Sequence, residues 1–89
     1  MGVLPIPAKM YFDDFSFELL NYALIRNSQT ISNLNGLIDS DEDGKHIKFL
    51  IGPDIAVNDV LSLGNKSYIV SSIEFDTFNG KLEIIKAYF

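Results

Sequence analysis

The sequence predicts a mainly β fold, in which five or six short strands form a small barrel or a rolled antiparallel sheet. Three observations lead to this prediction. Apolar and polar residues alternate in strand-like fashion after residue 31, and Gly, Pro and Asn interrupt the alternation at close spacing. A length of 89 residues allows one domain, and a hydrophobic content of 47% provides for its core. We expect residues 1–10 to form an arm and residues 11–89 to form a single β-rich domain.

The predicted arm contains two prolines, at positions 5 and 7. Proline excludes a regular helix here, and in a central strand it would forfeit a hydrogen bond. The arm is also apolar, so it packs on its own domain, extends into water or docks on a neighbouring subunit. Docking on a neighbouring subunit would bury the aliphatic side chains of the arm. It would not require space in the interior of the domain, which already has many Phe and Tyr side chains to accommodate. The sequence therefore predicts an oligomer or partner interface formed by Val3, Leu4, Pro5 and Ile6. Deleting residues 1–8 should then weaken assembly and leave the domain folded.

Residues 11–26 are compatible with two structures. Large apolar side chains recur at helical spacing, at Phe12, Phe15, Leu19 and Tyr22. Phe15, Phe17 and Leu19 also alternate as the residues of a strand do. The sequence favours neither pattern over the other, so a short N-terminal helix and a strand both stay open.

After a polar loop at residues 27–30, strands and turns alternate to the end of the sequence. The predicted strands are 34–38, 46–51, 60–63, 67–75 and 82–89. The residues predicted to form turns are Gly44, Gly52-Pro53-Asp54, Gly64 and Asn79-Gly80. Asn-Gly is the strongest of these signals, because both residues accept a positive φ at low cost. We expect Phe75 and Leu82, which flank this last turn, to face a common core. The number of strands suits an SH3-like or OB-like barrel.

Four acids within residues 39–43 form a candidate metal site. Asp39, Asp41 and Asp43, followed by Gly44, match the first half of a calcium-binding loop. A bidentate Glu should complete such a loop at its twelfth residue, where Leu50 stands. No helical pattern flanks the loop either. The sequence therefore favours the exposed tip of a β-hairpin, with no bound metal and no other cofactor.

The sequence shows no arrangement typical of a catalytic centre, and we expect no enzymatic activity. His46 is the one histidine, and it is expected on the polar side of a strand, exposed or half-buried. The adjacent acids Asp13 and Asp14 are typical of a helix cap or a solvated surface. The sequence contains no cysteine, which excludes a catalytic thiolate. The aromatic residues without basic residues beside them are expected in the core or in a subunit interface: Tyr11, Phe12, Phe15 and Phe17.

The formal net charge of −5 bears on the partners of the protein. An acidic chain repels phosphate backbones, and the seven Lys and Arg residues are scattered along the sequence. We therefore expect no specific nucleic-acid binding. No segment reaches the about 20 apolar residues that span a bilayer, so no membrane association is expected.

Residues 54–89 follow a pattern of a hydrophobic residue, a turn with Asn before Asp, a hydrophobic pair, a Gly-Lys-like turn, Tyr-x-Val and a final hairpin. Its parts are Ile55, Asn58-Asp59, Val60-Leu61, Gly64 to Lys66, Tyr68-Ile69-Val70 and the strands around Asn79-Gly80. In this pattern the segment resembles the closing β-segment of small neck proteins of tailed bacteriophages and prophages: the head–tail adaptor, head-completion and tail-completion families. Many small barrels share this order of turns and strands, and the acidic turn is not part of it.

The resemblance implies a structural protein, without an enzymatic site, that assembles into a ring at the head–tail junction. Its implied partners are further copies of the chain and the portal, connector or tail proteins of the phage. The implied location is the virion or the cytoplasm of the bacterial host. A second hypothesis is a small β-barrel adaptor that binds a protein or peptide through an exposed strand edge or an aromatic groove. A large assembly in solution would favour the first hypothesis.

Overall fold

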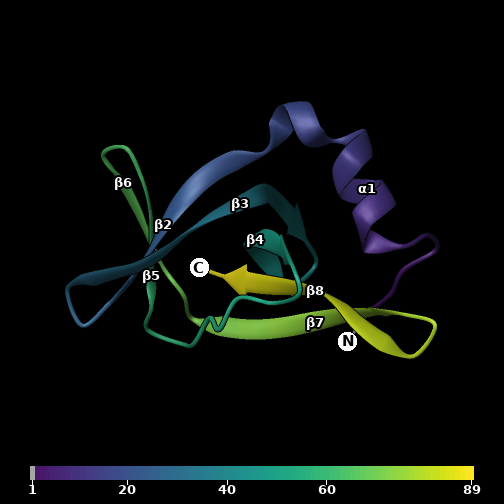
Figure 1. Ribbon diagram of the computed structural model, residues 1–89. Coiled ribbons are helices and arrows are strands. Elements are labelled where there is room, and N and C mark those ends of the chain that lie inside the picture. Colours follow the sequence, from purple (N-terminus) through teal and green to yellow (C-terminus); the bar gives the residue numbers. More distant parts are fainter. Residues whose placement is uncertain (1) are drawn as a thin grey trace.

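The computed structural model describes residues 2–89, which form eight strands, one α-helix and one short 3-10 helix (Figure 1). In chain order the elements are β1 (Gly2–Val3), α1 (Ala8–Asp14), the 3-10 helix η1 (Ser16–Glu18), β2 (Leu20–Arg26), β3 (Gln29–Asp41), β4 (Gly44–Leu50), β5 (Val60–Leu63), β6 (Lys66–Ile69), β7 (Ser72–Phe78) and β8 (Lys81–Tyr88). The strands form one sheet in the order β1-β7-β8-β4-β3-β2-β5-β6. Neighbouring strands are antiparallel, except that β1 and β7 run parallel.

The mainly β prediction is confirmed, but the sheet has more strands than the five or six predicted. It is mixed rather than purely antiparallel, and it is not closed into a barrel. Three strands account for the difference. The arm contributes β1, residues 20–26 form β2, and the strand predicted at 67–75 is divided into β6 and β7. At Val70 the chain leaves β6 and bonds instead to the loop before β5, where its N–H donates to the carbonyl of Asp59 (2.9 Å).

The long strand β3 belongs to both halves of the sheet. Its first part, up to Gly36, pairs with β2, and its last part, from Leu37, pairs with β4. Figure 1 shows the strand curving between the two. A Cβ atom at Gly36 would lie 2.6 Å from Cε1 of Phe49 and 2.8 Å from Cγ2 of Ile47. Glycine therefore lets the backbone of β3 approach the core closely where the strand curves.

The main hydrophobic core joins both halves of the sheet. It consists of Tyr22, Leu24, Ile47, Phe49, Ile55, Leu61, Val70, Ile85 and Ala87. A second, smaller cluster lies beneath α1 and consists of Ala8, Phe12, Leu37 and Ile84, with Leu4, Tyr11 and Leu19 packed against it. The short helix is thus held by the side chains that it buries, because a helix of two turns is marginal by itself.

The N-terminal arm packs on its own domain. The N–H of Leu4 donates to the carbonyl of Thr77 (2.7 Å), and its side chain packs against the cluster beneath α1. The N–H of Gly2 donates to the carboxylate of Asp76 (3.1 Å), beside the two residue pairs of β1 and β7. The helix begins at Ala8, inside the segment predicted as arm, so the end of the arm is corrected from residue 10 to residue 7.

Both structures left open for residues 11–26 occur, one after the other. The helical spacing holds as far as Phe12, which is buried beneath α1, and the chain becomes β2 at Leu20. Phe15 and Phe17 belong to neither pattern, since they lie exposed around η1. The loop predicted at residues 27–30 is shorter than expected. Asn27 and Ser28, with φ of 53° and 64°, make a two-residue turn, and β3 begins directly after it.

The Asn79-Gly80 turn is confirmed as the tip of the hairpin between β7 and β8, with φ of 52° and 77°. Phe75 packs against the main core, but Leu82 is exposed, so the prediction that the two residues share a core is wrong. Asp76 pairs with Ile84 and Thr77 pairs with Leu82, which leaves one extra residue in β8. With this bulge Leu82 pairs with Thr77 on the face that carries Phe75, but it lies two residues from the hairpin tip and outside the main core.

Replacing Gly80 by Val should destabilise the protein by at least about 1 kcal/mol, because a β-branched residue resists the positive φ of this turn. The free energy of unfolding, measured by denaturant titration, checks this. Asn79→Gly is the control and should stay within about 0.5 kcal/mol of the wild type, since glycine accepts the same φ. Equal stability of Gly80→Val and wild type would contradict the argument.

Candidate functional site

The acidic segment is a hairpin tip whose carboxylates bind groups of the protein itself. Asp43 lies in the turn between β3 and β4, and its N–H donates to Oδ1 of Asp41 (2.8 Å). Asp39 accepts from Lys48 (3.1 Å), and Asp41 accepts from the hydroxyl of Tyr88 (2.7 Å). Within residues 2–89, no group of three His, Cys, Asp or Glu side chains could hold a metal ion. The three aspartates named by the sequence do not converge on one point.

His46 is 1% exposed, so the expectation of an exposed or half-buried residue is wrong. Its ring lies 4.8 Å from the ring of Tyr88, and its Nδ1 lies 3.3 Å from the carbonyl oxygen of Gly44 and 3.8 Å from Oδ2 of Asp41. The hydrogen bond from Tyr88 holds the pKa of Asp41 below its usual value. Burial and the same hydrogen bond raise the pKa of Tyr88 to about 12. The strand face that carries His46 is therefore a packed polar layer.

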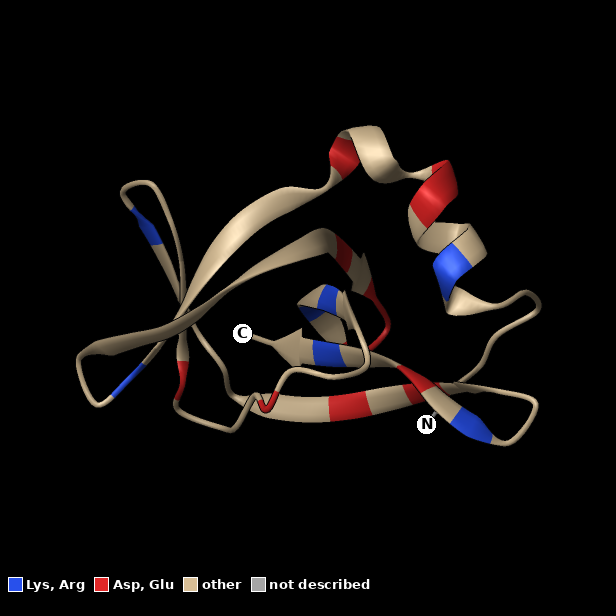
Figure 2. Ribbon diagram, viewed as in Figure 1, with Lys and Arg blue, Asp and Glu red and all other residues tan. Residues whose placement is uncertain are grey.

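Lys86 connects this layer to the N-terminal arm. Its Nζ lies 3.6 Å from Oδ2 of Asp41 and 3.3 Å from Oδ1 of Asp76, and Asp76 in turn accepts from the N–H of Gly2. Lys86 and Asp76 are both buried, which is tolerated because each is paired. Figure 2 shows where acidic and basic residues stand on β4, β7 and β8; of these, Lys48, Asp76 and Lys86 form ion pairs within the domain.

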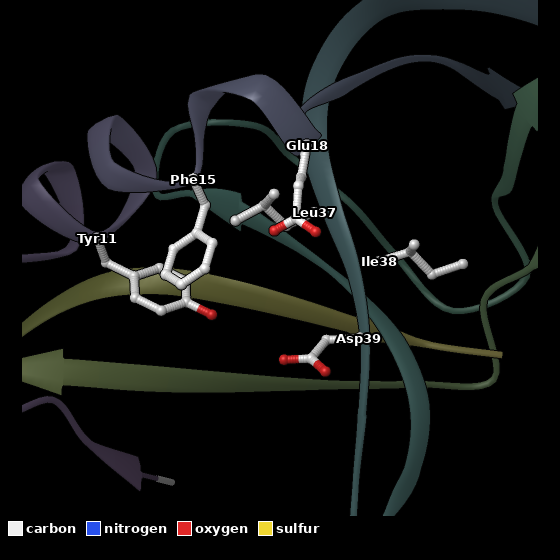
Figure 3. A pocket seen from close by; sticks show the side chains of 6 residues that line it. All are labelled: Tyr11, Phe15, Glu18, Leu37, Ile38 and Asp39. Atoms are coloured by element: carbon white, nitrogen blue, oxygen red, sulfur yellow. The ribbon is translucent and has the colours of Figure 1, made fainter.

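A concave site of about 530 Å³ lies beside the acidic segment (Figure 3). Its lining comes from α1, η1 and β3, namely Tyr11, Phe15, Glu18, Leu37, Ile38 and Asp39. The rings of Tyr11 and Phe15 lie 4.9 Å apart and form one aromatic wall. Figure 3 shows the carboxylate of Asp39 directed towards this wall, and the side chain of Ile38 directed away from it. We refer to this site as the aromatic–acidic pocket.

One cation of the protein is already bound at the edge of the aromatic–acidic pocket. Nζ of Lys48 lies 3.1 Å from Oδ2 of Asp39 and 5.1 Å from the centroid of the Tyr11 ring. It also donates to the hydroxyl of Tyr11 (3.4 Å). A carboxylate and an aromatic face are the two groups that attract an ammonium or guanidinium ion. The pocket is therefore suited to positively charged groups.

A second polar site fastens the loop before β5. Arg26 donates through Nε and Nη2 to both carboxylate oxygens of Asp59 (2.8 and 2.7 Å), and Asp59 also accepts from the N–H of Ala56. Asp59 is 3% exposed. The bidentate contact with Arg26 lowers the pKa of Asp59. This pair stabilises the segment between β4 and β5.

We expect part of the stability of the protein to depend on the charge of Asp59. Because its pKa is lowered by folding, this contribution is complete above the ordinary value of 3.8 and is lost as the pH falls below it. Urea titrations of the wild type and of Asp59→Asn should therefore differ clearly at about pH 7 and less at about pH 3. The same difference at both pH values would contradict this assignment.

A row of aliphatic side chains crosses β2, β5 and β6 on the outer face of the sheet. Ile25 pairs with Val60, and Val60 pairs with Ile69. Paired residues share a face, and the preceding pair, Leu24 and Leu61, is buried in the core. The three side chains therefore point outward; Ile69 is 63% exposed, and Ile25 and Val60 are half-buried. We refer to Ile25, Val60 and Ile69 as the aliphatic row; the sequence analysis did not find it, because it depends on the register of three strands.

The interface predicted in the N-terminal arm stays a prediction. Val3 is 82% exposed, whereas Leu4 and Ile6 are half-buried against their own domain. Of the four aromatic residues considered for a core or an interface, Phe12 is buried, Tyr11 is half-buried, and Phe15 and Phe17 are exposed. The sequence pattern could not tell which of the four aromatic side chains are buried, because all four lie close together in or next to α1 and η1.

Within residues 2–89, no helix is both long enough and apolar enough to cross a membrane. Comparison with models of known protein families, with curated proteins and with solved structures finds no significant match.

Proposed function

We propose that the chain is a non-enzymatic structural protein of a phage or prophage particle, which assembles at the head–tail junction or in the tail by self-association. In this proposal it is found in the virion, and before assembly in the cytoplasm of the bacterial host. Its partners are further copies of itself and the portal, connector or tail proteins. The resemblance of residues 54–89 to phage neck proteins suggests the setting, and the aliphatic row supports the mode of association.

The aliphatic row carries the proposal because it ends at an unpaired strand edge. β6 is the last strand of the sheet and pairs only with β5 among the described residues. An unpaired edge with exposed aliphatic side chains favours pairing with another chain. Lys66 is the one charged residue in β6, and it lies at the start of the strand, away from Ile69. The end of the β6 edge, at Ile69, therefore carries no charge that would oppose contact with another chain.

A row across three strands suits contact with a second copy better than capture of a short peptide. A peptide added to β6 would cover the edge but not Ile25 and Val60, which are half-buried in their own domain. A second sheet placed against the row would cover all three side chains. Ile69 would contribute most, up to about 1.5 to 3 kcal/mol, because Ile25 and Val60 are already half-buried. The adaptor hypothesis therefore remains the alternative, in which the domain stays a monomer.

Size-exclusion chromatography with light scattering tests the proposal. The wild type should show a mass above the 10.0 kDa of one chain, rising with protein concentration. Ile69→Lys should shift the mass towards one chain, because it places a charge inside the contact. Leu82→Lys is the matched control, since Leu82 is an exposed aliphatic residue on a strand outside the row. A wild type that stays monomeric at every concentration, or equal effects of the two variants, would refute self-association through this surface.

A further inference from the structure

The aromatic–acidic pocket has one carboxylate that forms no ion pair within residues 2–89. Both oxygens of Asp39 accept hydrogen bonds, from the N–H of Ser40 (2.8 Å) and from Lys48 (3.1 Å). Glu18 lies at the rim, on η1, and its carboxylate forms no ion pair with any cation of residues 2–89. Figure 3 shows this carboxylate directed towards the pocket, near Leu37. With Glu18 and Asp39 negative and Lys48 positive, one negative charge is left uncompensated.

The aromatic wall beside Glu18 is also available. The ring of Phe15 is 38% exposed and leans against the ring of Tyr11. Lys48 shows how the pocket holds a cation, since it is bound by a carboxylate and lies near an aromatic face. Glu18 and Phe15 offer the same pair of groups at the part of the pocket formed by η1, with nothing of the described chain bound there. The pocket therefore has room and complementary charge for a second cation.

We propose that the aromatic–acidic pocket binds an arginine side chain of a partner protein, with its guanidinium between the ring of Phe15 and the carboxylate of Glu18. A guanidinium is planar, so it stacks on an aromatic ring while donating two parallel hydrogen bonds to a carboxylate. A metal ion would require a set of three ligands that residues 2–89 do not provide. Nucleic acid and anionic lipid are repelled by the same carboxylates.

The arginine comes from a different protein rather than from a second copy of this chain. The sequence contains one arginine, Arg26, and both Nε and Nη2 of that residue are bound to Asp59. This inference goes beyond the proposed self-association and does not depend on it. The pocket lies between α1, η1 and β3, whereas the aliphatic row lies on β2, β5 and β6.

Titration of the labelled full chain with N-acetyl-arginine amide, followed by NMR, tests the proposal. Saturable shifts are expected at Tyr11, Phe15, Glu18 and Asp39, and they should weaken as salt is added. N-acetyl-citrulline amide has nearly the same shape without the charge and should cause no saturable shift. N-acetyl-lysine amide should bind more weakly, because an ammonium ion neither stacks nor donates in parallel. No saturable shift with the arginine probe, or equal binding of the citrulline probe, would overturn the proposal, and tighter binding of the lysine probe would overturn the assignment to arginine.

Three variants locate the site. Glu18→Gln should weaken binding of the arginine probe about fivefold, and Phe15→Leu about threefold. Glu42→Gln is the matched control for Glu18→Gln, since Glu42 is an exposed acid at the hairpin tip outside the pocket, and it should bind as the wild type does. Lys48→Met should tighten binding, because it removes the competing cation and frees Asp39. Equal effects of the two Glu→Gln variants, or unchanged binding by Lys48→Met, would overturn the proposed position.

The variant Ile69→Lys, in contrast, should bind the arginine probe as the wild type does. The failure of the arginine site and the failure of self-association can therefore be told apart.

Discussion

Phe49→Ala should destabilise the protein by about 3 to 5 kcal/mol, the cost of removing a buried aromatic ring and leaving a cavity. Phe49 is 1% exposed and lies in the main core, where its ring meets that of Tyr22 edge-on, with centroids 6.1 Å apart. The backbone of β3 at Gly36 also packs closely against the Phe49 ring. Because small domains have a total stability of about 5 to 15 kcal/mol, this loss would bring the protein near unfolding.

Urea titration by circular dichroism measures this effect. Phe17→Ala is the matched control, since Phe17 is 82% exposed on η1, and its free energy of unfolding should stay within about 0.5 kcal/mol of the wild type. Similar losses for the two variants would mean that Phe49 is not part of a well-packed core.

Gly36→Ala should destabilise the protein by about 1 to 3 kcal/mol through overpacking. The added methyl group would lie within 3 Å of both Phe49 and Ile47, and both side chains are buried, so they must shift to admit it. The expected cost arises from contact between β3 and β4 rather than from backbone conformation, so it should depend on what stands at position 49. Asn33→Ala, at an exposed position of the same strand, should cost less than about 0.5 kcal/mol.

A double-mutant cycle separates these contributions. Phe49→Leu shortens the side chain that the new methyl group meets, so Gly36→Ala should cost at least about 0.5 kcal/mol less in that background. If the cost of Gly36→Ala is the same in both backgrounds, the close approach of β3 to Phe49 is not its cause.

The features that the sequence predicted correctly are those that a few neighbouring residues decide. Asn79-Gly80 makes a hairpin tip because both residues accept a positive φ, whatever surrounds them. Ile47 and Phe49 alternate with their neighbours, and this alone places them on the buried face of β4. The mainly β class follows from the same local patterns, repeated along residues 34–89.

Other features depend on which strands meet and in what register, and only the tertiary structure decided these. His46 is on the polar face that alternation predicted, yet it is buried, because Tyr88 and Asp41 cover it from β8 and β3. Leu82 pairs with Thr77 on the face that carries Phe75, yet it is exposed, because it lies next to the hairpin tip and outside the main core. Gly36 looks like any glycine in the sequence, and its role appears only where β3 passes over Phe49.

The candidate sites belong to this second group. Phe15 and Glu18 meet Asp39 because η1 is held over β3 by the cluster beneath α1, which Leu37 and Phe12 form from distant parts of the chain. The aliphatic row requires β2, β5 and β6 to be adjacent and in register. Local preferences of φ and ψ are fixed by a residue and its neighbours, whereas a pocket or a surface row is fixed by contacts between residues far apart in sequence. The sequence by itself therefore determined the class of the fold and its turns, and the packing of the sheet and helix determined the pocket and the surface row that the two proposals use.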